Sequence, residues 1–229
     1  MRHFLALALI TAAATAGFAQ ENDDGLTFDG LERIEPARVG AAYIDPDADF
    51  SVFRRVAILD PFVAFRSNWQ RDANRGRGRN VSARDMERIK ADVAWLFQDV
   101  FTQRLEAAGF EIVNVANFDV LVLRPAIIDL DVTAPDVRSA GRSRTWAASA
   151  GAATLYLQLI DSVSGDVLGR AIDRRAARRA GGQVAWTNRV TNSAEARRML
   201  GRWADILVDF LKAHYYSPGE SDEAPAGEE

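Results

Sequence analysis

Two long segments with the apolar spacing of an amphipathic helix constrain this chain more than any other feature. In residues 82–109, apolar side chains recur every three or four positions, at Met86, Ile89, Val93, Leu96, Phe97, Val100, Phe101 and Leu105. In residues 192–216, the same spacing holds for Met199, Leu200, Trp203, Leu207, Phe210 and Leu211. A helix with one apolar stripe buries that stripe against another element. The spacing therefore predicts two long helices packed on a common layer.

Both segments carry residues that are typical of helix ends. Ser82 and Asp85 have the spacing of a capping box, and Gly109 follows the last apolar position as a terminator. Asn192 and Glu195 occupy the corresponding positions at the start of the second segment. Trp95 lies nearly opposite the first apolar stripe at about 100° per residue, so we expect it to be exposed.

The remaining domain sequence reads as extended segments. RRVAILDPFVAF (residues 54–65) predicts a buried strand that bends or ends near Pro61. In residues 119–135, a second strand is expected to bury the face interrupted by Arg124, which carries Val120, Val122, Ala126, Ile128, Leu130 and Val132. Residues 151–161 place Leu155, Leu157 and Leu159 on one face, and residues 167–179 continue as another strand.

The stretch LQLIDSVSGDVLGRAIDRR connects the last two of these strands. Ser164-Gly165 stands between them as a hairpin turn would. Asp161 and Asp166 flank that reversal, where acidic side chains are solvated. The glycine and oxygen ligands of a calcium loop fall at offsets that this run does not match, so we interpret it as a turn.

The order strand, helix, several strands, helix predicts a single α/β (α+β) domain over residues 37–216. We expect a twisted mixed or antiparallel sheet of about five strands, with two long amphipathic helices on one face. Residues 1–19, a short positive start followed by an apolar run and small residues, predict a cleaved signal peptide. Residues 20–36 are expected to be a flexible segment, and residues 217–229 a disordered acidic tail.

The chain contains no cysteine. In an oxidising compartment this means that no disulfide supports the fold, and a lipid-attachment cysteine is absent as well. No apolar run long enough for a transmembrane span follows the leader. We therefore expect a periplasmic or secreted protein that has no transmembrane span in its mature form.

Residue usage argues against several classes of enzyme. After removal of the leader only one histidine remains, His214, which we expect at a helix end, and the lysines are Lys90 and Lys212. A Ser-His-Asp, Cys-His or zinc hydrolase site is very hard to build from this set. RGRGRN lacks the spacing of a phosphate-binding glycine loop. We accordingly predict no cofactor, no catalytic residue and no resident metal.

Carboxylates leave one enzymatic alternative open. Asp129 and Asp131 are two apart on an expected strand, and Asp60 ends another. Such a group could hold a hard cation or act as an acid/base pair in a carboxylate-dependent hydrolase. The other interpretation is that the solvent face of a half-exposed strand becomes polar near its end. Asp45, Asp47 and Asp49 alternate like calcium ligands, but Phe50 stands where the glycine should be, which indicates a solvated turn.

Arginine is the most unusual feature of the composition, since 28 basic residues less two lysines leave 26 arginines. Several lie beside tryptophan, and the candidate binding residues are Trp69, Arg75, Arg77, Arg79, Arg142, Arg144, Trp146 and Trp186. Guanidinium groups bind phosphate or carboxylate and stack on aromatic rings. Another envelope protein or an anionic envelope polymer is the expected partner; the net charge of -4 and the compartment argue against nucleic acid. Arginine in place of lysine throughout a GC-rich genome is the alternative explanation.

Three stretches together carry a family resemblance: AAYIDPDADFSVFRRVAILDPF, FDVLVLRPAIIDLDV and AATLYLQLIDSVSGDVLGRAIDRR. With the long helix between the first two and the tryptophan-bearing final helix, they resemble the bacterial family called domain of unknown function 3313, over roughly Val39 to Tyr215. The resemblance implies an exported protein of Gram-negative bacteria, in a family with many lipoproteins and no established activity or catalytic residues. Lacking a cysteine to lipidate, this chain departs from that pattern. We therefore expect a non-enzymatic binding or interaction module of the cell envelope.

Overall fold

The computed structural model describes residues 27, 29–35, 37–75, 80–132, 146–147, 149–178, 185–186 and 189–215. Three of its elements are helices: α1 (Trp69–Asn74), α2 (Ala83–Ala107) and α3 (Arg189–Tyr215), with a short 3-10 helix at Phe50–Val52. The strands are β1 (Glu32–Arg33), β2 (Ala41–Ile44), β3 (Arg55–Ile58), β4 (Phe62–Phe65), β5 (Glu111–Ile112), β6 (Val120–Val132), β7 (Trp146–Ala147), β8 (Ser149–Asp161), β9 (Val167–Arg178) and β10 (Ala185–Trp186).

The main sheet is mixed and has eight strands, so the expected number of about five was too low. Its order is β1-β2-β9-β8-β6-β3-β5, and β4 also pairs with β6. Strands β3, β4 and β6 run parallel, whereas β6, β8, β9, β2 and β1 form antiparallel pairs. Strands β1 and β5 contain two residues each and therefore show no periodicity in the sequence. The predicted strand around Pro61 is split into β3 and β4, which pair with successive parts of β6.

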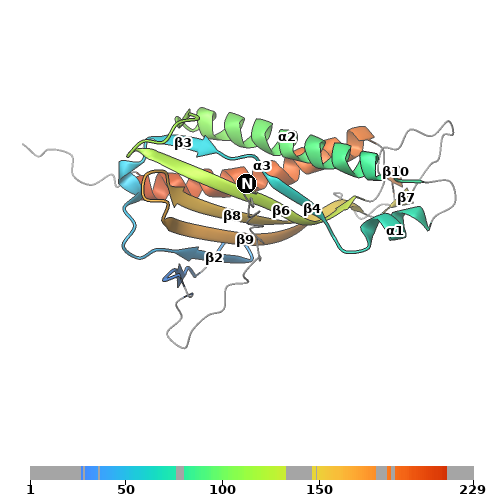
Figure 1. Cartoon of the computed structure of the whole chain (residues 1–229), viewed down its shortest axis with the longest axis horizontal. Coiled ribbons are helices and arrows are strands. Elements are labelled where there is room, and N and C mark those ends of the chain that lie inside the picture. Colours follow the sequence, from blue (N-terminus) through green and yellow to red (C-terminus); the bar gives the residue numbers. More distant parts are fainter. Residues whose placement is uncertain are drawn as a thin grey trace, which may run out of the picture.

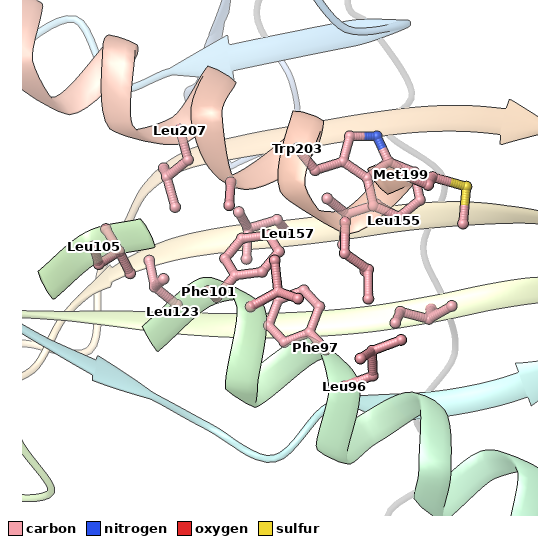
Figure 2. Packing of buried hydrophobic residues seen from close by; sticks show 14 of the residues in the cluster. Leu96, Phe97, Phe101, Leu105, Leu123, Leu155, Leu157, Met199, Trp203 and Leu207 are labelled. Atoms are coloured by element: carbon pink, nitrogen blue, oxygen red, sulfur yellow. The ribbon is translucent and has the colours of Figure 1, made fainter. Parts of the chain in front are cut away.

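Helices α2 and α3 lie side by side on one face of the sheet, with α3 behind β6, β8 and β9 in Figure 1. Their predicted stripes are buried in the core between the layers. Figure 2 shows the side chains that meet there: Leu96, Phe97, Phe101 and Leu105 from α2, Met199, Trp203 and Leu207 from α3, and Leu123, Leu155 and Leu157 from the strands. The third helix, α1, is short and was not expected.

Strand β6 buries the opposite face from the one predicted. Its core side chains are Leu121, Leu123 and Ile127, each at most 1 % exposed, whereas Arg124 is exposed. At Asp129, where φ is 51°, a bulge shifts the register against β8 and brings Leu130 into the core. The prediction failed because both alternations in this strand are apolar, so the period of two does not choose between them.

Most predicted helix ends and turns are confirmed. Ser82 and Asp85 form the capping box of α2, and Gly109 follows the helix with φ 96°. In the β8–β9 hairpin, Asp161 Oδ1 accepts hydrogen bonds from the backbone N–H groups of Val163 and Ser164, at 2.7 and 3.0 Å. The expected start of the last helix was wrong, because α3 already begins at Arg189 and Asn192 lies inside it.

Candidate functional site: an apolar pocket beside helix α3

Trp69 does not belong to an exposed binding surface. Only 2 % of it is exposed, its ring stacks on Phe65 with centroids 4.1 Å apart, and its Nε1 donates to the carbonyl oxygen of Val132 at 3.3 Å. The expectation of a surface tryptophan was therefore wrong for this position. The arginine-rich sequence around Trp69 does not indicate that this residue, the first of α1, is buried. Trp95, by contrast, is exposed as predicted, with 63 % accessible.

The other predicted arginines and tryptophans are only partly visible. Arg75 ends α1, and its Nη1 lies 3.2 Å from Asp72 Oδ1. Arg77, Arg79, Arg142 and Arg144 lie outside the described residues. The backbones of Trp146 and Trp186 are paired directly across the two-stranded sheet of β7 and β10. This pairing brings the backbones of two of the candidate tryptophans together.

Two of the three carboxylates of the hydrolase alternative, Asp129 and Asp131, are paired with different arginines. Asp131 Oδ2 accepts from Arg66 Nε at 2.9 Å, and Asp129 Oδ2 lies 3.9 Å from Arg174 Nη1. Asp60 is exposed in the β3–β4 connection. A guanidinium beside a carboxylate competes with a cation for the same oxygens. Within the described part of the chain, no three His, Cys, Asp or Glu side chains are grouped closely enough to hold a metal ion.

A concave apolar pocket lies between α3 and the sheet, beside strands β2 and β9. This pocket has a volume of about 300 Å³. It is lined by Ile34, Ala37, Arg38, Val39, Ala42, Tyr43, Leu155, Leu157, Leu159, Gly169, Arg170, Ala171, Trp203, Ile206, Leu207, Asp209, Phe210, Ala213 and His214. A cavity of that size with an apolar lining is typical of small-molecule sites.

The width of the sheet explains why a pocket forms there. Packed helices lie about 8–10 Å apart and strands about 4.8 Å apart, so two helices cover roughly four strands. The main path of this sheet contains seven strands. Helix α2 contacts β4 and β5, and α3 contacts β8 and β9, so β2 lies beyond the helical layer. The gap between α3 and this uncovered edge is the pocket.

Small residues make the floor of the pocket. Ala42 of β2 pairs with Ala171 of β9, and Gly169 pairs with Leu159 of β8. Cross-strand partners share one face of a sheet, and Leu159 is a core residue, so these small residues face α3. A leucine in place of Ala42 or Ala171 would fill the space that the short side chain leaves open.

One wall is a strap, which we define as residues 34–35 and 37–40, joining β1 and β2. Ile34, Ala37 and Val39 line the pocket from this strap. Arg38 Nη1 reaches across to Asp209 Oδ2 on α3, at 2.5 Å. Because 62 % and 57 % of these two side chains are exposed, the ion pair contributes little stability.

A buried carboxylate fixes the far end of the strap. Asp173 of β9 is 9 % exposed and accepts hydrogen bonds from Trp203 Nε1 at 2.7 Å and from the backbone N–H of Gly40 at 3.0 Å. Arg175 Nε donates to the same carboxylate. Asp173 therefore joins the sheet, α3 and the strap at one point. Sequence reasoning did not find this role, because Trp203 and Gly40 lie far from Asp173 along the chain and Arg175 is one of many arginines.

Residues that precede β1 are bound to the other face of β9. Arg170, with a side chain 5 % exposed, forms an ion pair with Asp29, and Thr27 Oγ1 donates to the same carboxylate at 2.5 Å. Burial alone would raise the pKa of Asp29, but the hydrogen bonds from Arg170 and Thr27 outweigh it and hold the pKa below its usual 3.8. Part of the segment expected to be flexible, residues 20–36, is thus packed on the sheet.

This pairing predicts an acid-dependent contribution to stability. A carboxyl whose pKa is lower in the folded state stabilises the fold above its unfolded value of 3.8, and that stabilisation is lost as pH falls through the folded pKa. Asp29→Asn should lower the free energy of unfolding at pH 7 by on the order of 1–2 kcal/mol and flatten its decline below pH 4. Urea unfolding at pH 7, 5, 4 and 3 measures both effects. An unchanged acid slope in the variant would contradict the assignment.

His214 lies at the end of α3, as predicted, and its Nδ1 is 2.8 Å from the carbonyl oxygen of Phe210. Its ring packs edge-on against the buried Phe50, with centroids 5.9 Å apart. His214 and Phe210 both line the pocket. In the part of the chain that is described, no helix is both long and apolar enough to cross a membrane.

Comparison with known proteins supports a family but no activity. The model of a family described as "Protein of unknown function (DUF3313)" matches residues 16–207. No curated protein matches the chain.

Several solved structures share part of the fold at low identity. A PelC dodecamer from Paraburkholderia phytofirmans has a TM-score of 0.37 at 13 % identity, covering 70 % of this chain and 91 % of that one. A minor lipoprotein from Acinetobacter baumannii has a TM-score of 0.34 at 10 % identity, covering 71 % and 94 %. Protein XCC0632 from Xanthomonas campestris has a TM-score of 0.39 at 16 % identity, covering 72 % and 86 %. Likeness at this level says nothing of ligand or assembly.

Proposed function

Since the chain belongs to the DUF3313 family of proteins of unknown function, we propose a role from its own geometry: a non-enzymatic binding module of the cell envelope. Its binding site is the pocket beside α3, and what it binds there is an apolar molecule. The envelope setting rests on the signal peptide expected at residues 1–19.

The observation that carries this proposal is the composition of the pocket floor. In a well-packed core, space of this size is filled by larger side chains, because an empty apolar cavity costs stability. Here Ala42, Gly169 and Ala171 leave about 300 Å³ open beneath Trp203 and Leu207. An apolar cavity of about 150 Å³ is already enough to bind benzene. A bound apolar molecule would make the van der Waals contacts that larger side chains make in a filled core.

The arginine-rich loops are proposed as a second contact region, for another envelope protein or an anionic envelope polymer. Trp146 and Trp186, whose backbones are paired across β7 and β10, and the arginines near Trp146 in the sequence, Arg142 and Arg144, are the residues proposed for this contact. Trp69 is excluded from this region by its burial.

Filling the pocket should abolish binding without unfolding the protein. Ala42→Leu places a large apolar side chain on the floor, so the affinity for the fluorescent apolar probe N-phenyl-1-naphthylamine should fall by on the order of tenfold or more, about 1.4 kcal/mol. Fluorescence titration of the purified full chain measures this, with circular dichroism as the check on folding.

Ala41→Leu is the matched control, because Ala41 is the neighbouring residue on β2 and pairs with Ile172 on the opposite face of the sheet. Its probe affinity should stay within twofold of the unmodified chain, roughly 0.4 kcal/mol. Equal loss in both variants, or no loss in Ala42→Leu, would refute the pocket as the binding site.

A further inference from the structure

The pocket interior is hydrocarbon on every side. Its floor and walls carry alanine, glycine, leucine, isoleucine, valine and aromatic side chains. Of the charged residues in its lining, Arg38 and Asp209 are paired with each other and more than half exposed at the rim, and Arg170 is paired with Asp29, on the other face of β9. A ligand held inside therefore meets apolar groups, and any polar part of it remains at the rim.

The pocket is long and narrow. Its lining residues on α3 run from Trp203 to His214, a separation of 11 residues, or about 16 Å at 1.5 Å per residue. A volume of about 300 Å³ spread over that length gives a mean cross-section of about 19 Å². Carbon atoms in contact lie about 4 Å apart, so one packed chain takes up on the order of 16–20 Å². A mean cross-section of this size matches that of a single hydrocarbon chain.

The two ends of the pocket differ. At one end Trp203, 2 % exposed, is held by its hydrogen bond to Asp173, which also binds Gly40 of the strap, so this end is closed. At the other end Ala213 and His214 are exposed, close in the helix to Asp209. The polar rim and the opening therefore coincide.

We infer that the ligand is a single-chain amphiphile, whose one unbranched hydrocarbon chain lies along α3 with its tip at Trp203 and its polar head at Arg38, Asp209 and His214. This inference rests on the proposed function and specifies its ligand. Carbon–carbon bonds of about 1.5 Å advance roughly 1.25 Å each along an extended chain, so the pocket accommodates about a dozen carbons. The strap, tied to α3 by an exposed ion pair, is the part that separates to admit the chain.

A homologous series tests the shape of the ligand. Straight-chain carboxylates of six to sixteen carbons are titrated into the purified full chain below their micelle concentrations, by calorimetry and by displacement of N-phenyl-1-naphthylamine. Affinity should rise about three- to fourfold per methylene while the chain enters the pocket, then level off near a dozen carbons. Ala171→Leu should move that plateau to shorter chains, because Ala171 lies two residues from the closed end at Asp173. Ala41→Leu should leave it in place.

A second experiment compares ligand shape at constant carbon number. Dodecanol and cyclododecanol contain the same number of carbons, and the chain should bind at least tenfold more tightly than the ring. Dodecanoate and dodecyltrimethylammonium carry the same chain on an anionic and a cationic head group. Each should bind within tenfold of dodecanol, because the head group remains in water at the rim.

These outcomes distinguish failure of the single-chain ligand from failure of the proposed binding function. Equal binding of ring and chain, or no dependence on chain length, overturns the single-chain ligand even if the naphthylamine probe still responds to Ala42→Leu. If neither the probe nor any alkyl compound responds to Ala42→Leu, the proposed function fails as well.

Discussion

Replacing Phe101 by alanine is expected to lower the free energy of unfolding by about 3–5 kcal/mol. Phe101 is fully buried, and its ring stacks on that of Phe97 with centroids 3.9 Å apart. Figure 2 shows the pair between the two helices and the sheet, so the cavity left behind would be bordered on all sides and could not collapse freely. Thermal unfolding should show a fall in Tm on the order of 10 °C.

Phe62→Ala is the matched control for this prediction. Phe62 is 65 % exposed on β4, so the same truncation removes little buried area there. Its effect should stay within about 0.5 kcal/mol. If both variants lost similar stability, the two-layer core would not be the main source of stability.

Replacing Asp173 by alanine should cost about 3 kcal/mol, although the change removes no apolar contact. Three donors lose their acceptor: Trp203 Nε1, the backbone N–H of Gly40 and Arg175 Nε. The indole N–H is buried and gains no water in exchange. Because this carboxylate also holds the closed end of the pocket, affinity for N-phenyl-1-naphthylamine should fall as well. Urea unfolding and probe titration measure the two effects separately.

Asp166→Ala is the control for charge removal, since Asp166 is exposed in the β8–β9 hairpin and its loss should change stability by less than about 0.5 kcal/mol. A double-mutant cycle of Asp173→Asn and Trp203→Phe isolates the direct bond. If the two changes in the free energy of unfolding simply add, the hydrogen bond between Asp173 and Trp203 contributes no coupling energy to stability.

The periodicity of apolar residues correctly predicted those features that are determined within a single helix or strand. The stripes of α2 and α3 were readable because a helix on a flat partner buries one side over many turns, and Leu155, Leu157 and Leu159 of β8 followed the same logic for a strand. Ser82, Gly109 and the hairpin at Gly165 were predictable because caps and turns are bonded within a few residues.

Positions that depend on a second element were mispredicted. Trp69 lies among arginines in the sequence, yet its burial is decided by Phe65 and by Val132 on β6. The buried face of β6 was wrongly assigned because Leu121, Leu123 and Ile127 alternate with residues that are nearly as apolar. In both cases the sequence contains the residue type but not the neighbour that buries it.

The sequence by itself determined two one-sided helices, the strands between them and a residue set poor in histidine, cysteine and lysine, because each of these depends on local spacing or composition. Only the tertiary structure decided where the pocket lies. The short side chains at Ala42, Gly169 and Ala171 become a floor only because α3 ends its coverage at β9 and the strap closes the far side. A cavity depends on which elements meet, and strand order and helix placement are set by long-range packing.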